Sequence, residues 1–285
     1  MDEKIITGWE PERRIHFDEI VEKYNNIRPE YPDKVFEDIV QYSGQKKGKK
    51  ALEIGAGTGK ATAPFLSAGH DVTAVEISEN MARFLLRRFE QYENFNVIIS
   101  SFEDTTLEND CYDLIYAASA FHWVDTKVGC PKMFNLLTNG GACALLRYNF
   151  NTHPVEGEVL SEEFEALYEE YYYSYYKSNY RPVKLNHDLL ETPGRILSGY
   201  GFDNLREYGF VDVSMKFYDV TLNYEADKYI ALLDTLSDHR ALPNNNRMAL
   251  YTGIKKIILE QGGHHTVDCI FQLYMGRKAP ISAPL

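Results

Sequence analysis

Short apolar runs alternate with helical patterns over residues 50–147 of this chain. The apolar runs predict five strands, at residues 51–54, 71–76, 96–99, 113–117 and 141–147, the last after the turn Asn139-Gly140-Gly141. Between them, apolar residues recur at helical spacing over residues 60–68, 79–92 and 127–137. Strands that alternate with helices in this way predict a doubly wound, mostly parallel α/β sheet.

The segments on either side of this core have other patterns. Upstream, residues 17–43 predict two helices, and we interpret residues 1–45 as an N-terminal helical lid. Downstream, residues 156–179 place apolar and tyrosine side chains on one helical face. We interpret residues 151–209 as a helical insert on the core.

The last part of the chain, residues 210–285, predicts more sheet. Residues 211–222 and 267–276 read as strands, and residues 227–236 and 246–259 between them read as helices. If the two strands pair as an antiparallel hairpin at the sheet's edge, the result is a seven-stranded, Rossmann-like sheet. We therefore expect a single domain of 285 residues with residues 50–147 as its cofactor-binding core.

Charge and composition narrow the partners. The chain has 30 Lys and Arg against 42 Asp and Glu, a net charge of -12, and its one basic run, Lys46–Lys50, is short. Since nucleic acids bind clustered cations, we expect no nucleic-acid partner. No apolar stretch approaches the ~18 residues of a membrane helix, and the N-terminus lacks a signal-peptide pattern, so we expect no membrane partner. The four cysteines form no CxxC pair, which predicts a cytoplasmic protein without a metal site.

A glycine-rich loop follows the first predicted strand, with the sequence Glu53-Ile54-Gly55-Ala56-Gly57-Thr58-Gly59. Glycines let the backbone turn sharply and let a ligand lie against bare main chain. Glu76 ends the second strand, 21 residues after Gly55, where a carboxylate can accept hydrogen bonds from ribose hydroxyls. The loop and the acid together predict a ligand that contains adenosine.

Two residues indicate which adenosine ligand this is. The dinucleotide fingerprint GxGxxG would place its third glycine at Lys60, whereas the third glycine here is Gly59. Glu53 adds a carboxylate that would repel a pyrophosphate and attract an ammonium group. S-adenosyl-L-methionine carries an ammonium and a sulfonium but no phosphate, so the pattern favours it over NAD. The alternative interpretation is a glycine turn that binds nothing.

The segments Glu53–Gly59 and Tyr112–Ile115, together with Glu76, resemble the class I S-adenosylmethionine-dependent methyltransferases with a type 11 methyltransferase domain. Two further segments, Tyr24–Pro32 and Ala120–Asp125, resemble the subgroup that contains trans-aconitate methyltransferases. The resemblance implies a transferase that uses S-adenosyl-L-methionine without a metal and releases S-adenosyl-L-homocysteine.

The resemblance also implies which residues bind the cofactor. The glycine loop would line its methionine and ribose parts, Ile77 would pack on the adenine, and the loop after the third strand would meet the adenine's edge. Ser101 stands where family members often have an aspartate, so Glu103 or Asp104 is an alternative acceptor for the adenine amino group. The predicted cofactor-binding residues are Tyr24, Arg28, Glu53, Gly55, Ala56, Gly57, Thr58, Gly59, Glu76, Ile77, Ser101, Phe102, Glu103 and Ala117.

Three residues are candidates for the reaction itself. His122 and Trp123 follow the fourth strand at its carboxyl end, where His122 would orient or deprotonate the substrate and Trp123 would wall the pocket. The alternatives are that His122 caps the next helix and that Trp123 is core. Arg28 would fork onto a carboxylate of the cofactor or of an acidic substrate, or else lie on the surface.

Other polar residues are ambiguous. The tyrosines between residues 168 and 180 would line an aromatic pocket or simply pack. Arg240 would bind an acid group or end a solvated helix. His264 and His265 have no third metal ligand at a useful spacing and predict an exposed turn.

The sequence therefore predicts an enzyme that transfers a methyl group from S-adenosyl-L-methionine to a small molecule, with carboxylic acids among the candidates. Two other functions stay open: a module that binds the cofactor without catalysis, and a nucleotide-dependent oxidoreductase.

Overall fold

The computed structural model describes residues 21–44, 47–151, 159–179, 181, 183–191 and 202–279. The first part of the predicted lid, residues 1–20, lies outside the described residues. So do residues 152–158 and 192–201 of the predicted insert.

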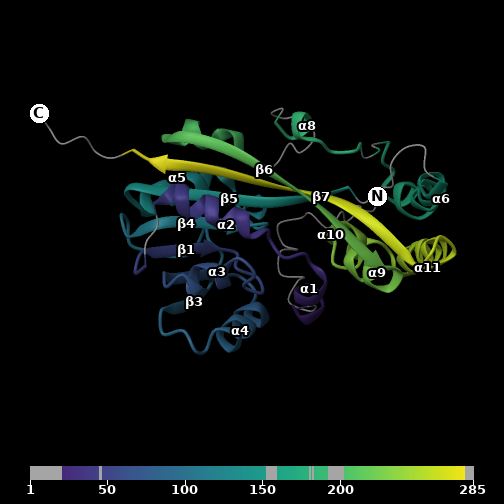
Figure 1. Cartoon of the computed structure of the whole chain (residues 1–285), viewed down its shortest axis with the longest axis horizontal. Helices are drawn as coiled ribbons and strands as arrows, with labels where there is room; N and C mark the ends of the chain where they lie inside the picture. The colour runs from purple at the N-terminus through teal and green to yellow at the C-terminus, as the bar shows by residue number, and fades with distance from the viewer. Residues whose placement is uncertain are drawn as a thin grey trace, which may run out of the picture. The chain divides into compact units, whose positions relative to one another are not determined.

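All seven predicted strands are present and form one sheet in the order β3-β2-β1-β4-β5-β7-β6. They are β1 (Lys50–Ile54), β2 (Asp71–Glu76), β3 (Phe95–Ile99), β4 (Tyr112–Ala118), β5 (Leu137–Asn151), β6 (Phe210–Glu225) and β7 (His264–Lys278). Within the run β3-β2-β1-β4-β5, each strand pairs in parallel with the next, as Figure 1 shows. The predicted doubly wound order is therefore confirmed for the core.

Helices form in every predicted helical segment that the structure describes, and two further short helices lie at His187–Glu191 and Ser237–Ala241. The α-helices are α1 (Val21–Ile27), α2 (Asp33–Ser43), α3 (Thr62–Ser67), α4 (Glu79–Arg88), α5 (Thr126–Leu136), α6 (Val159–Tyr168), α7 (Ser174–Tyr176), α8 (His187–Glu191), α9 (Ala226–Leu233), α10 (Ser237–Ala241) and α11 (Asn244–Glu260). None of the helices that the structure describes is long and apolar enough to cross a membrane.

The chain divides into two compact units. The first unit comprises Met1–Pro29, Asn149–Asn186 and Asp219–Ile270. The second comprises Glu30–Tyr148, His187–Tyr218 and Phe271–Leu285. Strands β5, β6 and β7 contribute residues to both, and each unit is described by itself below.

Strand β7 gives the sheet its antiparallel edge. It lies between β5 and β6. Both of those strands begin in the second unit and end in the first, whereas β7 begins in the first and ends in the second (Figure 1). The predicted antiparallel pair at the edge of the sheet is therefore confirmed.

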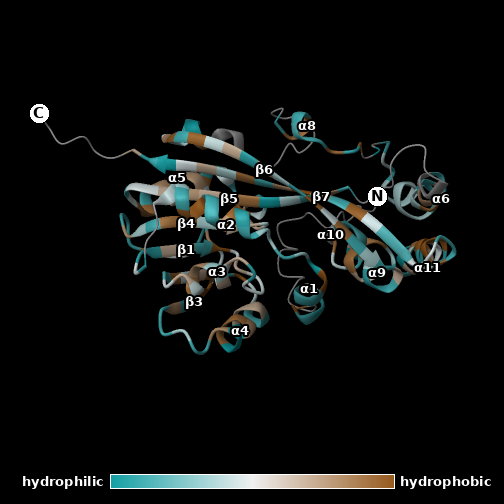
Figure 2. Ribbon diagram, viewed as in Figure 1, coloured by the Kyte–Doolittle hydropathy of each residue, from teal (hydrophilic) through white to brown (hydrophobic). Residues whose placement is uncertain are grey.

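The central strands are buried because helices cover a parallel sheet on both faces. Leu52 and Ile115 are fully buried on the neighbouring strands β1 and β4. Figure 2 shows the hydrophobic residues of β4 in brown. Helix α4 begins where the side chain of Ser78 accepts a hydrogen bond from the amide of Met81, at 3.0 Å. These contacts fix the carboxyl ends of β1, β2 and β4 beside one another.

Two local predictions need correction. Strand β5 starts at Leu137 rather than after a turn at residues 139–141, because Leu137 already pairs with Tyr112. The register then shifts, and Gly140 takes a φ of 78° inside the strand. The single helix predicted over residues 156–179 is α6 followed by a π-helix at Glu169–Tyr173 and by α7.

Candidate functional site

The glycine loop after β1 lies in the second unit and bends through three left-handed residues. Gly55, Gly57 and Gly59 have φ values of 66°, 56° and 81°. A Cβ on Gly55 would come within 2.5 Å of Ala120 Cβ, and one on Gly59 within 2.5 Å of the Phe89 ring. At Gly57 no described atom lies within 4 Å of that position. Two of the glycines thus serve close packing, whereas Gly57 faces open space that a ligand can enter.

Glu76 braces this loop from the end of β2. Its Oε2 accepts a hydrogen bond from the amide of Gly57 at 2.8 Å, and its Oε1 accepts one from the amide of Ser78 at 2.9 Å. The side chain is 6% exposed. Since each carboxylate oxygen can accept more than one hydrogen bond, Glu76 can hold the loop and still accept from a ligand.

Glu53 is deeply buried at the start of the loop. It is 1% exposed, and its Oε2 accepts hydrogen bonds from Thr62 Oγ1 at 2.5 Å and Tyr116 Oη at 2.9 Å. Burial raises the pKa of Glu53 to about 8, although both hydrogen bonds oppose that shift. The predicted attraction between Glu53 and an ammonium group requires an ionised carboxylate, and the burial of Glu53 opposes that charge. Neither Thr62 nor Tyr116 has a sequence pattern that indicates this contact.

The buried Glu53 predicts a specific pH dependence of stability. A carboxyl whose pKa rises from 4.5 to about 8 on folding stabilises the protein fully below pH 4.5 and loses that contribution as the pH rises to 8. From about pH 5.5 to about pH 8.5, the wild-type free energy of unfolding should therefore fall relative to that of Glu53→Gln, by up to roughly 3 kcal/mol. Urea unfolding at both pH values measures this difference. A difference that stays constant with pH would show that Glu53 is ionised throughout.

The loop after β3 is held by contacts that the sequence does not reveal. Lys132 Nζ on α5 donates to the carbonyls of Phe102 at 2.6 Å and Glu103 at 3.1 Å. Ser101 Oγ donates to Asp104 Oδ2 at 2.6 Å. Phe102 is 3% exposed and belongs to the hydrophobic core, so its ring is not open to a ligand.

The corner after β4 places the candidate reaction residues. Ser119 has a φ of 54°, unusual for a residue with a side chain, and its Oγ lies 3.2 Å from Tyr31 Oη, which donates to it. His122 and Trp123 follow in the short helix η2 (Phe121–Trp123), both half-buried, with ring centroids 5.3 Å apart.

The alternative that His122 caps the next helix is wrong. Asp125 caps helix α5, because its side chain accepts from the amide of Lys127 at 2.9 Å, so His122 is not the cap. Trp123 is half-buried, whereas its neighbour Phe121 is 3% exposed.

Most predicted site residues belong to the second unit. The residues of the glycine loop, Glu76 with Ile77, Ser101 to Glu103, and His122 with Trp123 all follow the carboxyl ends of β1 to β4, the edge where parallel sheets bind ligands. Ala117 lies just inside β4 and is 1% exposed.

Tyr24 and Arg28 belong to the first unit. Arg28 Nη2 donates to the carbonyl of Thr235 at 2.7 Å, and its guanidinium lies 5.1 Å from the centre of the Tyr24 ring. Within this unit, Arg28 is anchored to main chain rather than lying loose on a surface.

Two cations fasten the glycine loop. Arg88 Nη1 donates to the carbonyl of Thr58 at 2.6 Å. Lys60, whose side chain is 7% exposed, forms an ion pair with Glu30. In the sequence, Lys60 stands out only as the position where the dinucleotide fingerprint has a glycine, and no pattern assigns a role to Arg88. Among the described residues, no three His, Cys, Asp or Glu side chains form a group that could hold a metal ion.

The core of the chain matches a known protein family model. Residues 52–145 match a family model described as a methyltransferase domain. Over 132 residues the chain is 28% identical to an uncharacterized methyltransferase of Mycobacterium tuberculosis, and the match covers 46% of this chain and 51% of that protein. This chain thus spans about half the length of that relative. An uncharacterized methyltransferase of Schizosaccharomyces pombe is 23% identical over 237 residues, which cover 82% of this chain and 84% of that protein.

A solved structure extends the likeness to the fold. Phosphoethanolamine N-methyltransferase 2 of Haemonchus contortus, in complex with phosphomonomethylethanolamine and S-adenosylhomocysteine, superposes with a TM-score of 0.54 at 15% identity. The superposition covers 96% of this chain and 61% of that one. At this identity the likeness concerns the fold alone.

Proposed function

We propose that residues 52–145, which match a methyltransferase family model and carry the predicted Rossmann-like fold, form a class I S-adenosylmethionine-dependent methyltransferase domain, and that the chain binds S-adenosyl-L-methionine and transfers its methyl group. The observation that carries the proposal is the loop at Gly57. It presents bare main chain to open space and is braced by the carboxylate of Glu76. Main chain and carboxylate together suit a ribose and an amino acid moiety.

The charges around the loop favour this cofactor over a dinucleotide. Glu53 and Glu76 stand at the ends of the adjacent strands β1 and β2, and Lys60 is already paired with Glu30. A pyrophosphate at this loop would face these acids and would compete with Glu30 for Lys60. An ammonium group near Glu53 would instead offset the cost of ionising that buried carboxyl.

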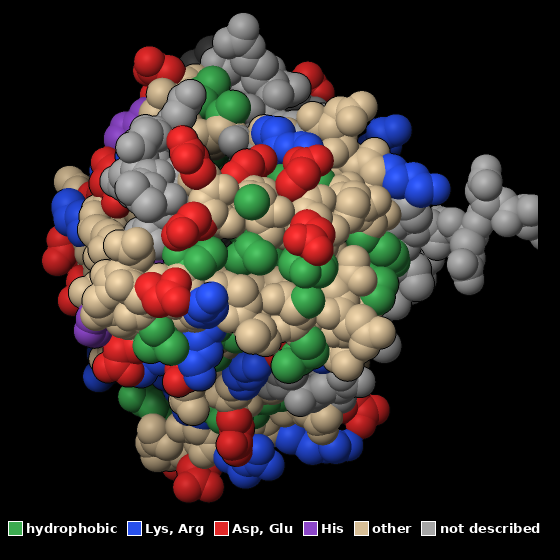
Figure 3. Space-filling view, turned by 90° about the vertical axis from the view of Figure 1, so that its right-hand side faces the viewer, with side chains coloured by type: hydrophobic (Ala, Val, Ile, Leu, Met, Phe, Trp, Pro, Cys, Tyr) green, Lys and Arg blue, Asp and Glu red, His purple; other side chains and the backbone are tan. Residues whose placement is uncertain are grey.

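The acceptor that we propose is a small molecule, with carboxylic acids among the candidates. On the face drawn in Figure 3, acidic side chains lie among the basic ones, and the whole chain carries a net charge of -12. A nucleic acid would instead need a concentrated basic surface. We also propose a reducing, cytoplasmic setting, since all four cysteines are free thiols.

When bound, the cofactor supplies an electrophilic methyl group on a sulfonium, which leaves as a neutral thioether when the acceptor attacks in line. The protein's task is to hold the acceptor on that line, where orientation supplies up to ~7–11 kcal/mol of the barrier. We assign this orientation to His122 and Trp123, which follow β4 as the glycine loop follows the adjacent β1. Arg28 is our candidate for binding a carboxylate, because a guanidinium can fork onto one.

Calorimetric titration of the full chain with S-adenosyl-L-methionine and with NAD tests the cofactor. We expect binding of the first alone, and binding of neither would refute the proposal. Transfer of a labelled methyl group to a panel of small acids, amines and phenols, with an RNA sample alongside, then tests the acceptor. Tight cofactor binding without any methyl transfer would support a non-catalytic binding module. Binding of NAD would support an oxidoreductase.

His122→Asn should separate catalysis from cofactor binding. The shorter amide keeps polarity but loses the imidazole that orients or deprotonates the acceptor, so kcat should fall roughly 100-fold while the cofactor Kd stays within about twofold. Steady-state kinetics and calorimetry on one preparation measure both. An unchanged kcat would remove His122 from the mechanism.

A further inference from the structure

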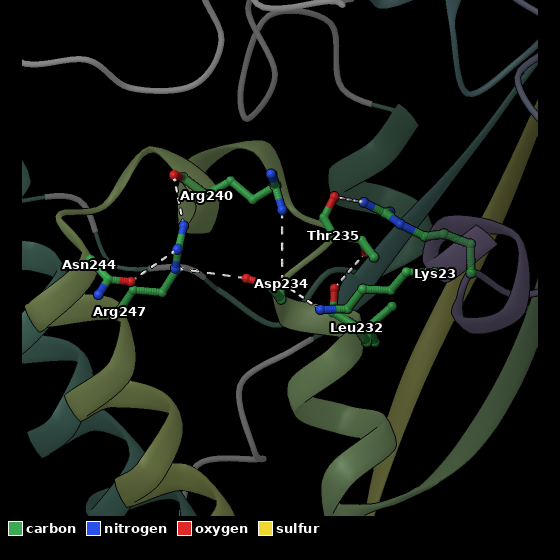
Figure 4. A network of polar contacts seen from close by, with 8 residues as sticks. Lys23, Leu232, Asp234, Thr235, Arg240, Asn244 and Arg247 are labelled. Carbon is green, nitrogen blue, oxygen red and sulfur yellow. Dashed lines mark hydrogen bonds and ion pairs between the residues drawn. The ribbon is translucent and has the colours of Figure 1, made fainter. Parts of the chain in front are cut away.

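The first unit gathers three cations around a single carboxylate. Figure 4 shows Lys23, Arg240 and Arg247 converging on Asp234, which ends α9. Lys23 bonds Asp234 Oδ2 directly, Arg240 Nη1 lies 3.9 Å from the same oxygen, and Arg247 Nε lies 3.8 Å from Oδ1. Lys23, Arg240 and Arg247 thus bring three cations to one carboxylate, in a chain whose net charge is -12.

The charged side chains of this cluster are partly shielded from water. The side chains of Arg240, Arg247 and Asp234 are only 20%, 23% and 21% exposed. Like charges that share a weakly solvated space repel one another more strongly than in water. A second anion at this place would relieve the repulsion that one carboxylate leaves.

Arg240 and Arg247 lie too far from Asp234 to form strong hydrogen bonds with it. Separations of 3.8 and 3.9 Å exceed the 2.7–2.9 Å typical of charge-assisted hydrogen bonds. Arg247 is steered instead by neutral acceptors, the carbonyl of Arg240 at 3.1 Å and Asn244 Oδ1 at 3.3 Å. Those two bonds use two of the five guanidinium N–H groups, so donors remain for another oxyanion.

Two buried polar atoms next to this cluster lack partners. Among the described residues, neither His239 Nδ1 nor Tyr251 Oη has a hydrogen-bond partner, although the residues are only 3% and 6% exposed. The two rings stack 5.9 Å apart. Burial raises the pKa of Tyr251, the charge of Asp234 raises it further and that of Arg247 lowers it, so the hydroxyl lies within electrostatic reach of the cluster. Buried polar atoms in proteins nearly always have a partner, which is often a water or a ligand.

A second acid near the cluster, Asp238, is held by a tyrosine hydroxyl. Asp238 Oδ2 accepts from Tyr172 Oη at 2.5 Å, and Tyr172 belongs to the π-helix Glu169–Tyr173. Single π-turns are frequent at functional sites. The tyrosines between residues 168 and 176 thus pack, and Tyr172 also donates to the carboxylate of Asp238.

We propose that Lys23, Arg240 and Arg247 form a binding site for a small oxyanion, a carboxylate or a phosphate group, and that Tyr251 or His239 supplies a further hydrogen bond. The site is built entirely from the first unit, and it does not depend on the proposed cofactor.

The test is calorimetric titration of the full chain, without S-adenosyl-L-methionine, using citrate and inorganic phosphate as separate probes. We expect saturable binding of at least one, and whichever binds more tightly identifies carboxylate or phosphate as the preferred group. Arg247→Gln and Arg240→Gln should each weaken binding at least about tenfold. The matched control is Lys255→Gln on the same helix α11, where Lys255 pairs with Asp227, and it should leave binding unchanged.

A second variant separates a ligand site from a structural ion cluster. Asp234→Asn removes the internal competitor and should tighten binding of the probe about tenfold, and the probe should raise its melting temperature more than that of the wild type. Circular dichroism confirms that each variant is folded, and Arg247→Lys keeps the charge should Arg247→Gln fail to fold. Binding of neither probe, or equal binding in the wild type, both arginine variants and the Lys255 control, would overturn the proposal.

Discussion

Gly57→Val is expected to abolish binding of S-adenosyl-L-methionine while the protein still folds. Gly57 has a φ of 56° and its Cβ position faces open space, so the valine methyl groups would fill that space rather than strike the protein. If that space belongs to the ligand, the Kd should rise at least about 100-fold, which corresponds to ~2.7 kcal/mol. Calorimetry measures the Kd, and circular dichroism checks the fold.

The matched control for this change is Gly44→Val. Gly44 ends helix α2 with a φ of 64° and likewise has no described atom within 4 Å of its Cβ position. Both variants pay a similar left-handed backbone penalty of about 1–2 kcal/mol, but only one stands in the glycine loop. Gly44→Val should therefore lose stability and keep cofactor affinity. A Gly57→Val protein that binds the cofactor normally would refute the role of the loop.

Glu76→Ala should weaken cofactor binding by ~1–3 kcal/mol, a rise in Kd of roughly 5- to 150-fold. Two losses contribute: the proposed acceptor for the ribose hydroxyls disappears, and the amides of Gly57 and Ser78 lose their partner. Glu76→Gln, which keeps one acceptor oxygen, should fall between the wild type and Glu76→Ala. Calorimetric titration of the three proteins gives the order.

Asp38→Ala is the control for removing a buried carboxylate. Asp38 on α2 is 4% exposed and accepts from Tyr218 at 2.7 Å, with Lys34 and Lys216 nearby. It does not contact the glycine loop, so its loss should lower the melting temperature without changing the cofactor Kd. If Glu76→Ala behaves in the same way, Glu76 is structural and its assignment to the ribose is wrong.

The sequence by itself determined the sheet and the position of the candidate site. Apolar runs and helical spacing are local signals, so they predicted all seven strands and the antiparallel edge. The order of strand, glycine loop and helix also placed Gly57 and Glu76 at one edge, since the carboxyl ends of parallel strands meet there. These features depend on residues near one another along the chain.

The tertiary structure alone decided which partners the polar side chains have. Glu53 is buried against Tyr116, 63 positions away, and that burial changes its expected charge. Lys132 holds the loop after β3, and Asp125 rather than His122 caps α5. The cations around Asp234 come from positions as far apart as Lys23 and Arg247. No local pattern encodes such pairs, because hydrogen bonds and ion pairs depend on distances in space that only the packed chain sets.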